Sequence, residues 1–359
     1  MGQCKVGIDG IVRSLYTYGS DKSYYDKQDM TNRNGSITLK VATDRYNTVV
    51  AESRSPNTAR AYAQSTAKFL DLLGDRNVNP DNAPIKSANE TWLIDFIGNL
   101  REHSPATEQL YLTAVVGFYE FLASEYDLDV NLARVRALVR RRQRRVPPKL
   151  PQFPRRDVET VIECVEAAAS EPCKDDREKL RNLRDKAFIL TLADTGLRIG
   201  EACGLTRGQY DRDERQAIVV IKGGAESIVR FSTRAHNAIL AYLEVRSHVD
   251  GASGRAMSAL PVFARHDRGA GKKLKQIKTV GARNIINNWV VRALGSASRG
   301  LITPHTFRHY FVTVVLRGSG GNLKLAQELA RHKNIAITQR YAHLADDDLD
   351  RGYHEIFNE

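Results

Sequence analysis

Six residues in the C-terminal half of this 359-residue chain have side chains suited to work on a phosphodiester. In chain order they are Arg198, Lys222, His305, Arg308, His332 and Tyr341. Arginine stays charged and its planar fork matches phosphate oxygens, so two arginines can hold one phosphodiester. Histidine and lysine can move protons, and a tyrosine hydroxyl can attack phosphorus. The set predicts phosphoryl transfer to tyrosine without a metal.

Arg198 lies at an expected turn that leads into a helix, after Thr195-Gly196-Leu197. Glu201 follows on the same helical face and could orient the Arg198 guanidinium, although an ordinary surface ion pair has the same spacing. Gly196 and Gly200 flank the arginine and allow the backbone to approach a ligand closely. We therefore expect Arg198 to bind the phosphate, with Glu201 as its support.

His305 and Arg308 belong to a second expected helix, which Thr303-Pro304 would begin. Because they are three residues apart, both side chains project from one face of that helix. His305 and His309 also form a His-x-x-x-His pattern, which could indicate a metal site. The residue after His305 is threonine rather than the glutamate of a zinc protease, and no third ligand is apparent. We therefore expect no metal.

Lys222 is expected at the tip of a β-hairpin. Residues 216–224 and 227–231 are predicted to be its two strands, with glycines directly after the lysine. A lysine at such a tip could reach into a neighbouring groove. Another basic loop supplies the alternative candidates, Lys272, Lys273 and Lys275.

His332 and Tyr341 complete the set near the end of the chain. His332 ends an expected helix over 323–331, and Tyr341 follows nine residues later. A tyrosine hydroxyl has an ordinary pKa near 10, so a histidine or a phosphate oxygen must assist its deprotonation. His343 is the alternative to His332, and a buried structural tyrosine is the alternative interpretation of Tyr341.

The order and spacing of these residues resemble those of the tyrosine recombinases, the phage-integrase family, over about residues 55–345. Residues 195–201 look like the family's first arginine box, and 305–308 look like its His-x-x-Arg box. His332 with Tyr341 is similar to the last box. The chain departs from the family pattern at Arg331, which stands where a glycine is usual, and after Lys222, where most of an Asn-Lys-Glu-Arg stretch is replaced.

The resemblance implies a transesterification. Tyr341 would attack a DNA phosphate held by Arg198 and Arg308, forming a 3′-phosphotyrosyl link and a free 5′-hydroxyl. The two histidines of the set would assist by hydrogen bonding and proton transfer, and Lys222 would be the general acid. Because the bond energy is stored in the covalent link, no cofactor is implied. A 5′-hydroxyl from a second strand would reverse the step through a Holliday junction.

The resemblance also implies a fold. It is mainly α with a small antiparallel β-sheet, in which an N-terminal helical core-binding (SAM-like) domain and a mixed α+β catalytic domain form a C-shaped clamp. The partners implied are double-stranded DNA, three further copies in a homotetramer on paired sites, and accessory DNA-bending or directionality proteins. A bacterial cytoplasmic, nucleoid-associated location without a membrane anchor would follow.

The composition agrees with a nucleic-acid partner. Lys and Arg total 54 against 42 Asp and Glu, and the formal net charge of +12 favours an anionic polymer. A hydrophobic fraction of 42 % is typical of a globular chain, and no apolar run reaches the length of a membrane span. The scattered Cys4, Cys164, Cys173 and Cys203 indicate free thiols in a reducing compartment rather than a zinc ribbon.

We expect the chain to divide into five segments, which are 1–50, 51–145, 146–154, 155–345 and 346–359. The first is polar and tyrosine-rich, and is predicted to be a flexible arm or small appendage with one short strand at 37–41. The second is the helical DNA-binding domain, with helices expected over 56–74, 90–101, 105–122 and 131–142. A proline-rich linker, the catalytic domain and an acidic tail follow. The tail could dock onto a neighbouring subunit or be solvated.

Five arginines cluster where the second segment ends, at Arg140, Arg141, Arg142, Arg144 and Arg145. A strap over the DNA backbone would suit them, since neutralising phosphates releases counterions. A solvated basic helix end is the alternative.

The extension at the N-terminus favours an integrase or transposase of a mobile element. A Xer-type resolvase of chromosome or plasmid dimers is the first alternative. A type IB topoisomerase shares the chemistry but relaxes DNA as a monomer without paired sites. A DNA-binding regulator that has lost catalysis would bind without covalent chemistry.

Overall fold

The computed structural model describes residues 37–144, 154–221, 224–267 and 274–341. The chain divides into two compact units between Pro148 and Lys149, and each unit has its own hydrophobic core. Among the described residues, no helix has both the length and the apolar character needed to cross a membrane.

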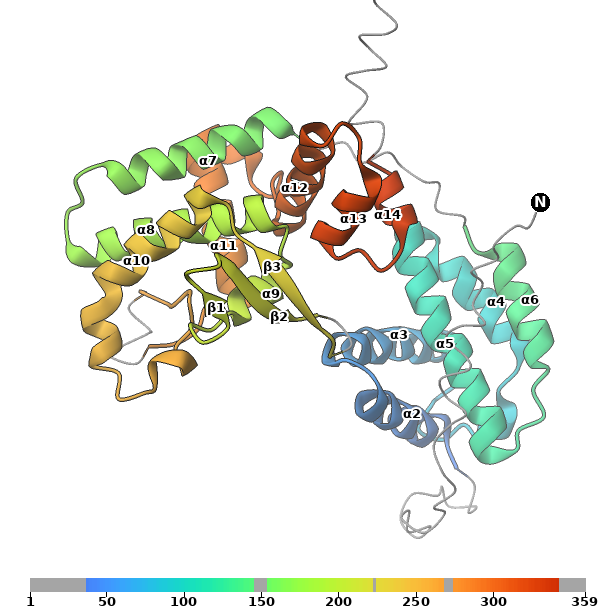
Figure 1. The fold of residues 1–359 in the computed structure, drawn as a ribbon. Coiled ribbons are helices and arrows are strands. Elements are labelled where there is room, and N and C mark those ends of the chain that lie inside the picture. Colours follow the sequence, from blue (N-terminus) through green and yellow to red (C-terminus); the bar gives the residue numbers. More distant parts are fainter. Residues whose placement is uncertain (1–36, 145–153, 222–223, 268–273, 342–359) are drawn as a thin grey trace, which may run out of the picture. The chain divides into compact units, whose positions relative to one another are not determined.

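Within residues 37–144, the N-terminal unit is built of helices (Figure 1). They are α2 (Leu39–Ser53), α3 (Pro56–Asp75), η2 (Ile85–Ser87), α4 (Glu90–Asn99), η3 (Leu100–Glu102), α5 (Pro105–Tyr126) and α6 (Leu132–Arg142). The side chains of Ser55 and Ser104 accept hydrogen bonds from the first turns of α3 and α5, and a proline follows each serine. Both helix starts were predicted from these Ser-Pro pairs.

The prediction of a flexible arm with a short strand at 37–41 is wrong for residues 39–50, which lie in helix α2. Residues 37–41 are not a strand, because a helix begins at Leu39 and packs against α3 and α5. Leu39, Ala42, Tyr46 and Val50 are buried at helical spacing, a pattern that the five-residue window over 37–41 did not contain. The Tyr46 hydroxyl donates a hydrogen bond to the backbone of α5 at 2.9 Å. Residues 39–50 therefore belong to the helical unit, whereas 1–36 lie outside the described residues.

The C-terminal unit combines helices with a three-stranded antiparallel sheet (Figure 1). Its elements are α7 (Arg155–Ser170), α8 (Asp176–Thr195), α9 (Ile199–Gly204), β1 (Tyr210–Asp211), β2 (Gln216–Val220), β3 (Glu226–Arg230), α10 (Thr233–Gly251), η4 (Met257–Ala259), α11 (Thr279–Leu294), η6 (Ser296–Ser298), α12 (Pro304–Gly318), α13 (Leu323–Ala330) and α14 (Ile335–Gln339). Strands β2 and β3 pair from Gln216 opposite Arg230 to Val220 opposite Glu226, as the predicted hairpin requires. Strand β1 was not predicted.

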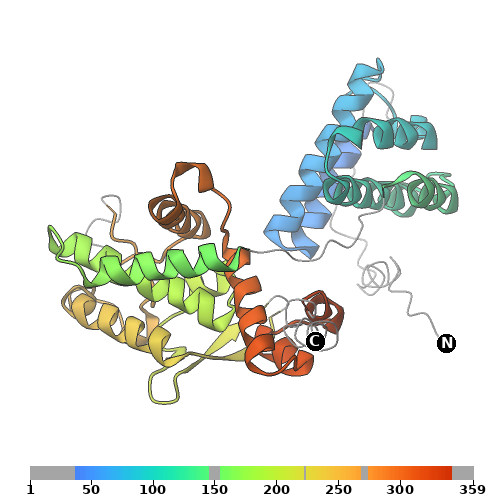
Figure 2. The same ribbon diagram turned by 90° about the horizontal axis from the view of Figure 1, so that it is seen from above.

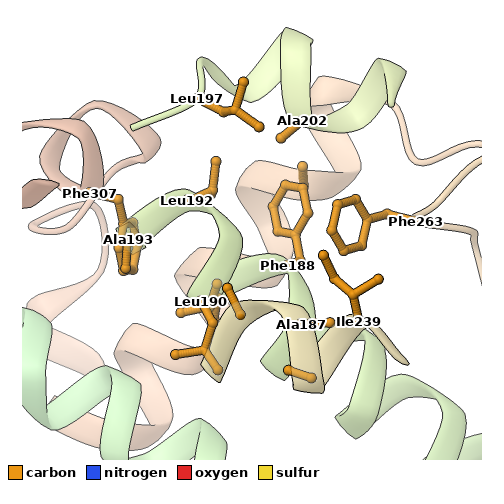
Figure 3. Close-up of a cluster of buried hydrophobic side chains, with 14 of the residues drawn as sticks. Ala187, Phe188, Leu190, Leu192, Ala193, Leu197, Ala202, Ile239, Phe263 and Phe307 are labelled. Carbon is orange, nitrogen blue, oxygen red and sulfur yellow. The ribbon is translucent and has the colours of Figure 1, made fainter. Parts of the chain in front are cut away.

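Helix α8 forms the centre of this unit and packs beside α7 and α10 (Figures 1 and 2). Figure 3 shows its Phe188 facing Phe263, and their ring centroids lie 5.1 Å apart in an edge-to-face arrangement. Leu197, two residues beyond the end of α8, is also fully buried in this cluster. Close packing on both sides of the α8–α9 turn leaves it little freedom, and that turn carries Arg198.

Candidate active site

The turn between α8 and α9 holds Arg198 between two constraints. Gly196 ends α8 in the left-handed conformation with φ of 58°, which favours glycine, and an added Cβ would lie 2.4 Å from the Phe311 ring. The Glu201 carboxylate accepts hydrogen bonds from the Arg198 backbone N–H at 3.0 Å and from its Nη1 at 2.7 Å. The Arg198 side chain is 45 % exposed and that of Glu201 is 8 % exposed. A nearly buried carboxylate thus orients an accessible guanidinium.

Helix α12 carries His305 and Arg308 in its first turns. Thr303 caps the helix, and a proline occupies the first position, as the sequence predicted. Arg308 is 4 % exposed. Its guanidinium donates hydrogen bonds to the carbonyl oxygens of Gly196 and Ala330. These bonds join α12 to the end of α8 and to the end of α13.

His332 and Tyr341 follow α13. Nδ1 of His332 is hydrogen-bonded to the Thr338 hydroxyl at 2.8 Å, and Thr338 also accepts the backbone N–H of Tyr341 at 2.9 Å. Tyr341 is 4 % exposed and packs in a small cluster with Phe311. The short helix α14 therefore fixes the tyrosine relative to His332.

His309 is the site residue that the sequence prediction missed. Its Nδ1 forms a hydrogen bond with the Tyr341 hydroxyl. Its ring also contacts that of His305, with centroids 4.2 Å apart. In the sequence His309 stands out only as half of a metal-binding pattern, although its spacing of four residues from His305 places both on the same helical face.

The histidines of the site have lowered pKa values. Burial and then the charges of Arg308 and Arg198 lower the pKa of His332 to about 4. Burial and then His305 and Arg340 lower the pKa of His309 to about 4. The pKa of His305 is lowered by burial and by Arg308. At pH 7 the three rings are predominantly neutral, so each has one unprotonated nitrogen that can accept a hydrogen bond.

Burial raises the pKa of the Tyr341 hydroxyl, while the charge of Arg308 opposes that change. The pKa of Arg308 is lowered to about 10, first by burial and then by the charges of Arg198 and Arg331. Arg308 still remains protonated at pH 7. Because these like charges disfavour one another, an anion bound among them would be stabilised.

The structure thus brings together five of the six predicted catalytic residues and their support Glu201. Several predicted or alternative residues lie outside the described part of the chain, namely Lys222, Arg145, Lys272, Lys273, His343 and the 346–359 tail. Lys275 is described, at an exposed position.

The linker arginines differ among themselves. Arg140, Arg141 and Arg142 are exposed at the end of α6. Arg144 instead pairs with Glu108 at 2.6 Å, and the Glu108 side chain is fully buried. The Arg144 guanidinium also donates a hydrogen bond to the His103 carbonyl oxygen, so both partners of this side chain belong to the N-terminal unit. Its contacts are therefore structural.

The fold and this constellation of arginines, histidines and a tyrosine define a class of enzyme that breaks and rejoins DNA strands through a tyrosine. A model of the phage integrase family matches residues 163–348, which is just over half of the chain and spans every predicted catalytic residue. The chain belongs to the phage integrase family, the tyrosine recombinases. The predicted family and fold class are confirmed.

The curated relatives include tyrosine recombinase XerC of Myxococcus xanthus. It is 27 % identical over 300 residues, which cover 83 % of this chain and 91 % of the relative. Tyrosine recombinase XerD of Mycobacterium leprae (strain TN) is 28 % identical over 308 residues, covering 82 % and 88 %.

Two solved structures have a similar fold. The XerH site-specific recombinase bound to palindromic difH substrate matches with a TM-score of 0.63 at 14 % identity, over 93 % of this chain and 92 % of that one. The Tn1549 transposon integrase in complex with transposon right end DNA has a TM-score of 0.56 at 19 % identity, over 89 % and 99 %.

Proposed function

We propose that this protein is a site-specific recombinase that cuts double-stranded DNA with Tyr341 as its nucleophile. The observation that carries the proposal is the hydrogen bond between the Tyr341 hydroxyl and His309, one residue after the buried Arg308. It joins the last box of the family pattern to the His-x-x-Arg box within one site. The Tyr341 hydroxyl also lies close enough to Arg308 for that charge to lower its pKa, as expected of a nucleophile beside a phosphate site.

In the proposed reaction Arg198 and Arg308 hold the scissile phosphate. Arg308 is fixed by two backbone carbonyls and Arg198 by Glu201, so neither guanidinium has to reorganise as charge develops. The pentacoordinate phosphorus carries more negative charge than the ground state, and fixed positive groups stabilise it preferentially. The neutral His305 and His332 add hydrogen bonds to the phosphate oxygens.

The Tyr341 oxygen forms a bond to phosphorus while the bond from phosphorus to the 5′ oxygen breaks. The Tyr341 proton passes to a non-bridging oxygen of the phosphate as the new bond forms, and the departing 5′ oxygen gains a proton from Lys222, the proposed general acid. The product is a 3′-phosphotyrosyl link. The 5′-hydroxyl of a second strand then attacks this link and releases the tyrosine, which exchanges strands when two sites are paired.

We further infer that the N-terminal unit binds DNA, that the exposed arginines at the end of α6 contact phosphates, and that four copies assemble on two sites. The similarity to the recombinases XerC and XerD supports a Xer-type role in joining paired sites over the mobile-element role predicted from the N-terminal extension. The acidic tail remains a proposed docking segment between copies.

Supercoiled plasmids carrying one or two copies of a DNA site recovered by covalent trapping test this proposal. A recombinase converts a plasmid with two directly repeated sites into two circles. It does not divide the one-site plasmid. Relaxation of a plasmid without any site would instead indicate a type IB topoisomerase, and binding without either product a regulator. If only sites from the ends of a mobile element recombine, the mobile-element prediction replaces the Xer-type role.

A further inference from the structure

Arg331 occupies a backbone conformation that costs free energy for any residue other than glycine. It follows α13 with φ of 58°, in the left-handed region. The glycine usual in the family at this position would avoid that cost. Contacts of the arginine side chain can offset that cost.

The Arg331 side chain supplies such contacts. It is only 5 % exposed, and its Nη atoms donate hydrogen bonds to Leu329 O at 3.0 Å and Gly196 O at 3.2 Å. Both Nη atoms also lie 3.4 Å from Thr195 O. The guanidinium thus reaches from the end of α13 to the end of α8, directly before the Arg198 turn.

Two of the groups that Arg331 contacts are shared with the phosphate-binding arginines. The Gly196 carbonyl oxygen also accepts a hydrogen bond from Arg308. The Glu201 carboxylate, which holds Arg198, lies 3.8 Å from Nη2 of Arg331. Arg331 therefore contacts the Glu201 carboxylate that supports Arg198 and one of the two carbonyl oxygens that support Arg308. No other described residue has hydrogen bonds or ion pairs to both of these groups.

We propose that Arg331 is a positioning residue that sets the spacing between Arg198 and Arg308. Its hydrogen bonds to Thr195 and Gly196 fix the backbone of the turn that carries Arg198. Its positive charge beside Glu201 holds that carboxylate in its orientation. A third guanidinium under the site also adds positive potential where the phosphate binds. This inference rests on the proposed function, because it assigns Arg331 to the same phosphate site.

Arg331→Gly distinguishes a positioning role from a role in folding. Glycine adopts the left-handed conformation without strain, so the variant loses the guanidinium but not the backbone geometry. We expect an unfolding temperature equal to or above that of the wild type, and single-turnover cleavage at saturating DNA at least tenfold slower. Arg331→Lys keeps the charge but not the fork, and should recover part of the rate. Arg215→Gly is the matched control, since Arg215 is also left-handed, with φ of 51°, in the turn between β1 and β2. It should leave the rate unchanged.

A wild-type cleavage rate in Arg331→Gly would overturn the proposal, and so would a slow variant whose unfolding temperature falls, because that result indicates a structural residue. Hydrogen exchange in DNA-free protein supplies an independent measurement. Amides of residues 197–201 should exchange faster in Arg331→Gly than in the wild type or Arg215→Gly. If the wild type forms no covalent link with DNA, the proposed function fails while the exchange result still supports or refutes the positioning role.

Discussion

Replacing His309 tests how the nucleophile is oriented. His309→Asn places an amide oxygen near the position of Nδ1, so it can keep the hydrogen bond to the Tyr341 hydroxyl but cannot take up a proton. His309→Leu removes the hydrogen-bond partner of the Tyr341 hydroxyl. A hydrogen bond between neutral groups contributes about 0.5–1.5 kcal/mol, so His309→Leu should slow cleavage about two- to tenfold. His309→Asn should stay close to the wild-type rate.

The pKa values of the two groups explain why we expect orientation rather than full proton transfer. The pKa of His309 is about 4, and that of Tyr341 is raised above the ordinary value of 10.0. Both shifts disfavour moving the proton from Tyr341 to His309 before attack. Single-turnover cleavage of a nicked duplex, with Kd measured separately, is the assay. A cleavage rate reduced 100-fold or more in both variants would show that His309 is the base. An unchanged cleavage rate in His309→Leu would refute a role of His309 in orienting Tyr341.

Three further predictions follow from the contacts of the site and of the linker region. Glu201→Gln should slow single-turnover cleavage about 10- to 100-fold, because charge-assisted hydrogen bonds contribute about 1.5–3 kcal/mol; an unchanged rate would argue against its orienting role. The pKa of His332 is lowered to about 4 in the folded chain, so the unfolded chain takes up a proton first as the pH falls. The contribution of His332 to the free energy of unfolding should therefore be fully present above pH 6.5 and be lost as the pH falls from 6.5 to 4. Thermal unfolding across this range should depend less on pH in His332→Asn. Arg144→Ala leaves the buried Glu108 charge without its partner and should reduce the free energy of unfolding by roughly 3 kcal/mol; Arg141→Ala should not, but should weaken DNA binding in a salt-dependent way.

The sequence predicted the local geometry around the candidate site where neighbouring residues determine it. Thr303 and the proline after it specify where α12 begins, and the three-residue spacing then places His305 and Arg308 on one face. Gly196 marks the left-handed end of α8, so the turn that presents Arg198 was also predictable. In these cases neighbouring residues in the chain determine the geometry.

Contacts between distant segments were not predictable in the same way. The bond from Tyr341 to His309 spans 32 residues and depends on how α13 and α14 fold back onto α12. Arg144 resembled the exposed arginines before it, and only its approach to Glu108, 36 residues earlier, distinguishes it. Helix α2 was missed because its buried positions are spread over twelve residues whose polar neighbours dominate the local composition.

The central claim is that Tyr341 attacks DNA, and a covalent-adduct assay tests it most directly. Wild-type protein and Tyr341→Phe would be incubated with nicked duplexes and separated on denaturing gels, because a nick near the cleavage site prevents religation. The account predicts a DNA-linked protein band for the wild type and none for Tyr341→Phe, with equal DNA affinity for both. An adduct that persists in Tyr341→Phe would show that another residue is the nucleophile, and tight binding without an adduct in either protein would contradict catalysis by this chain.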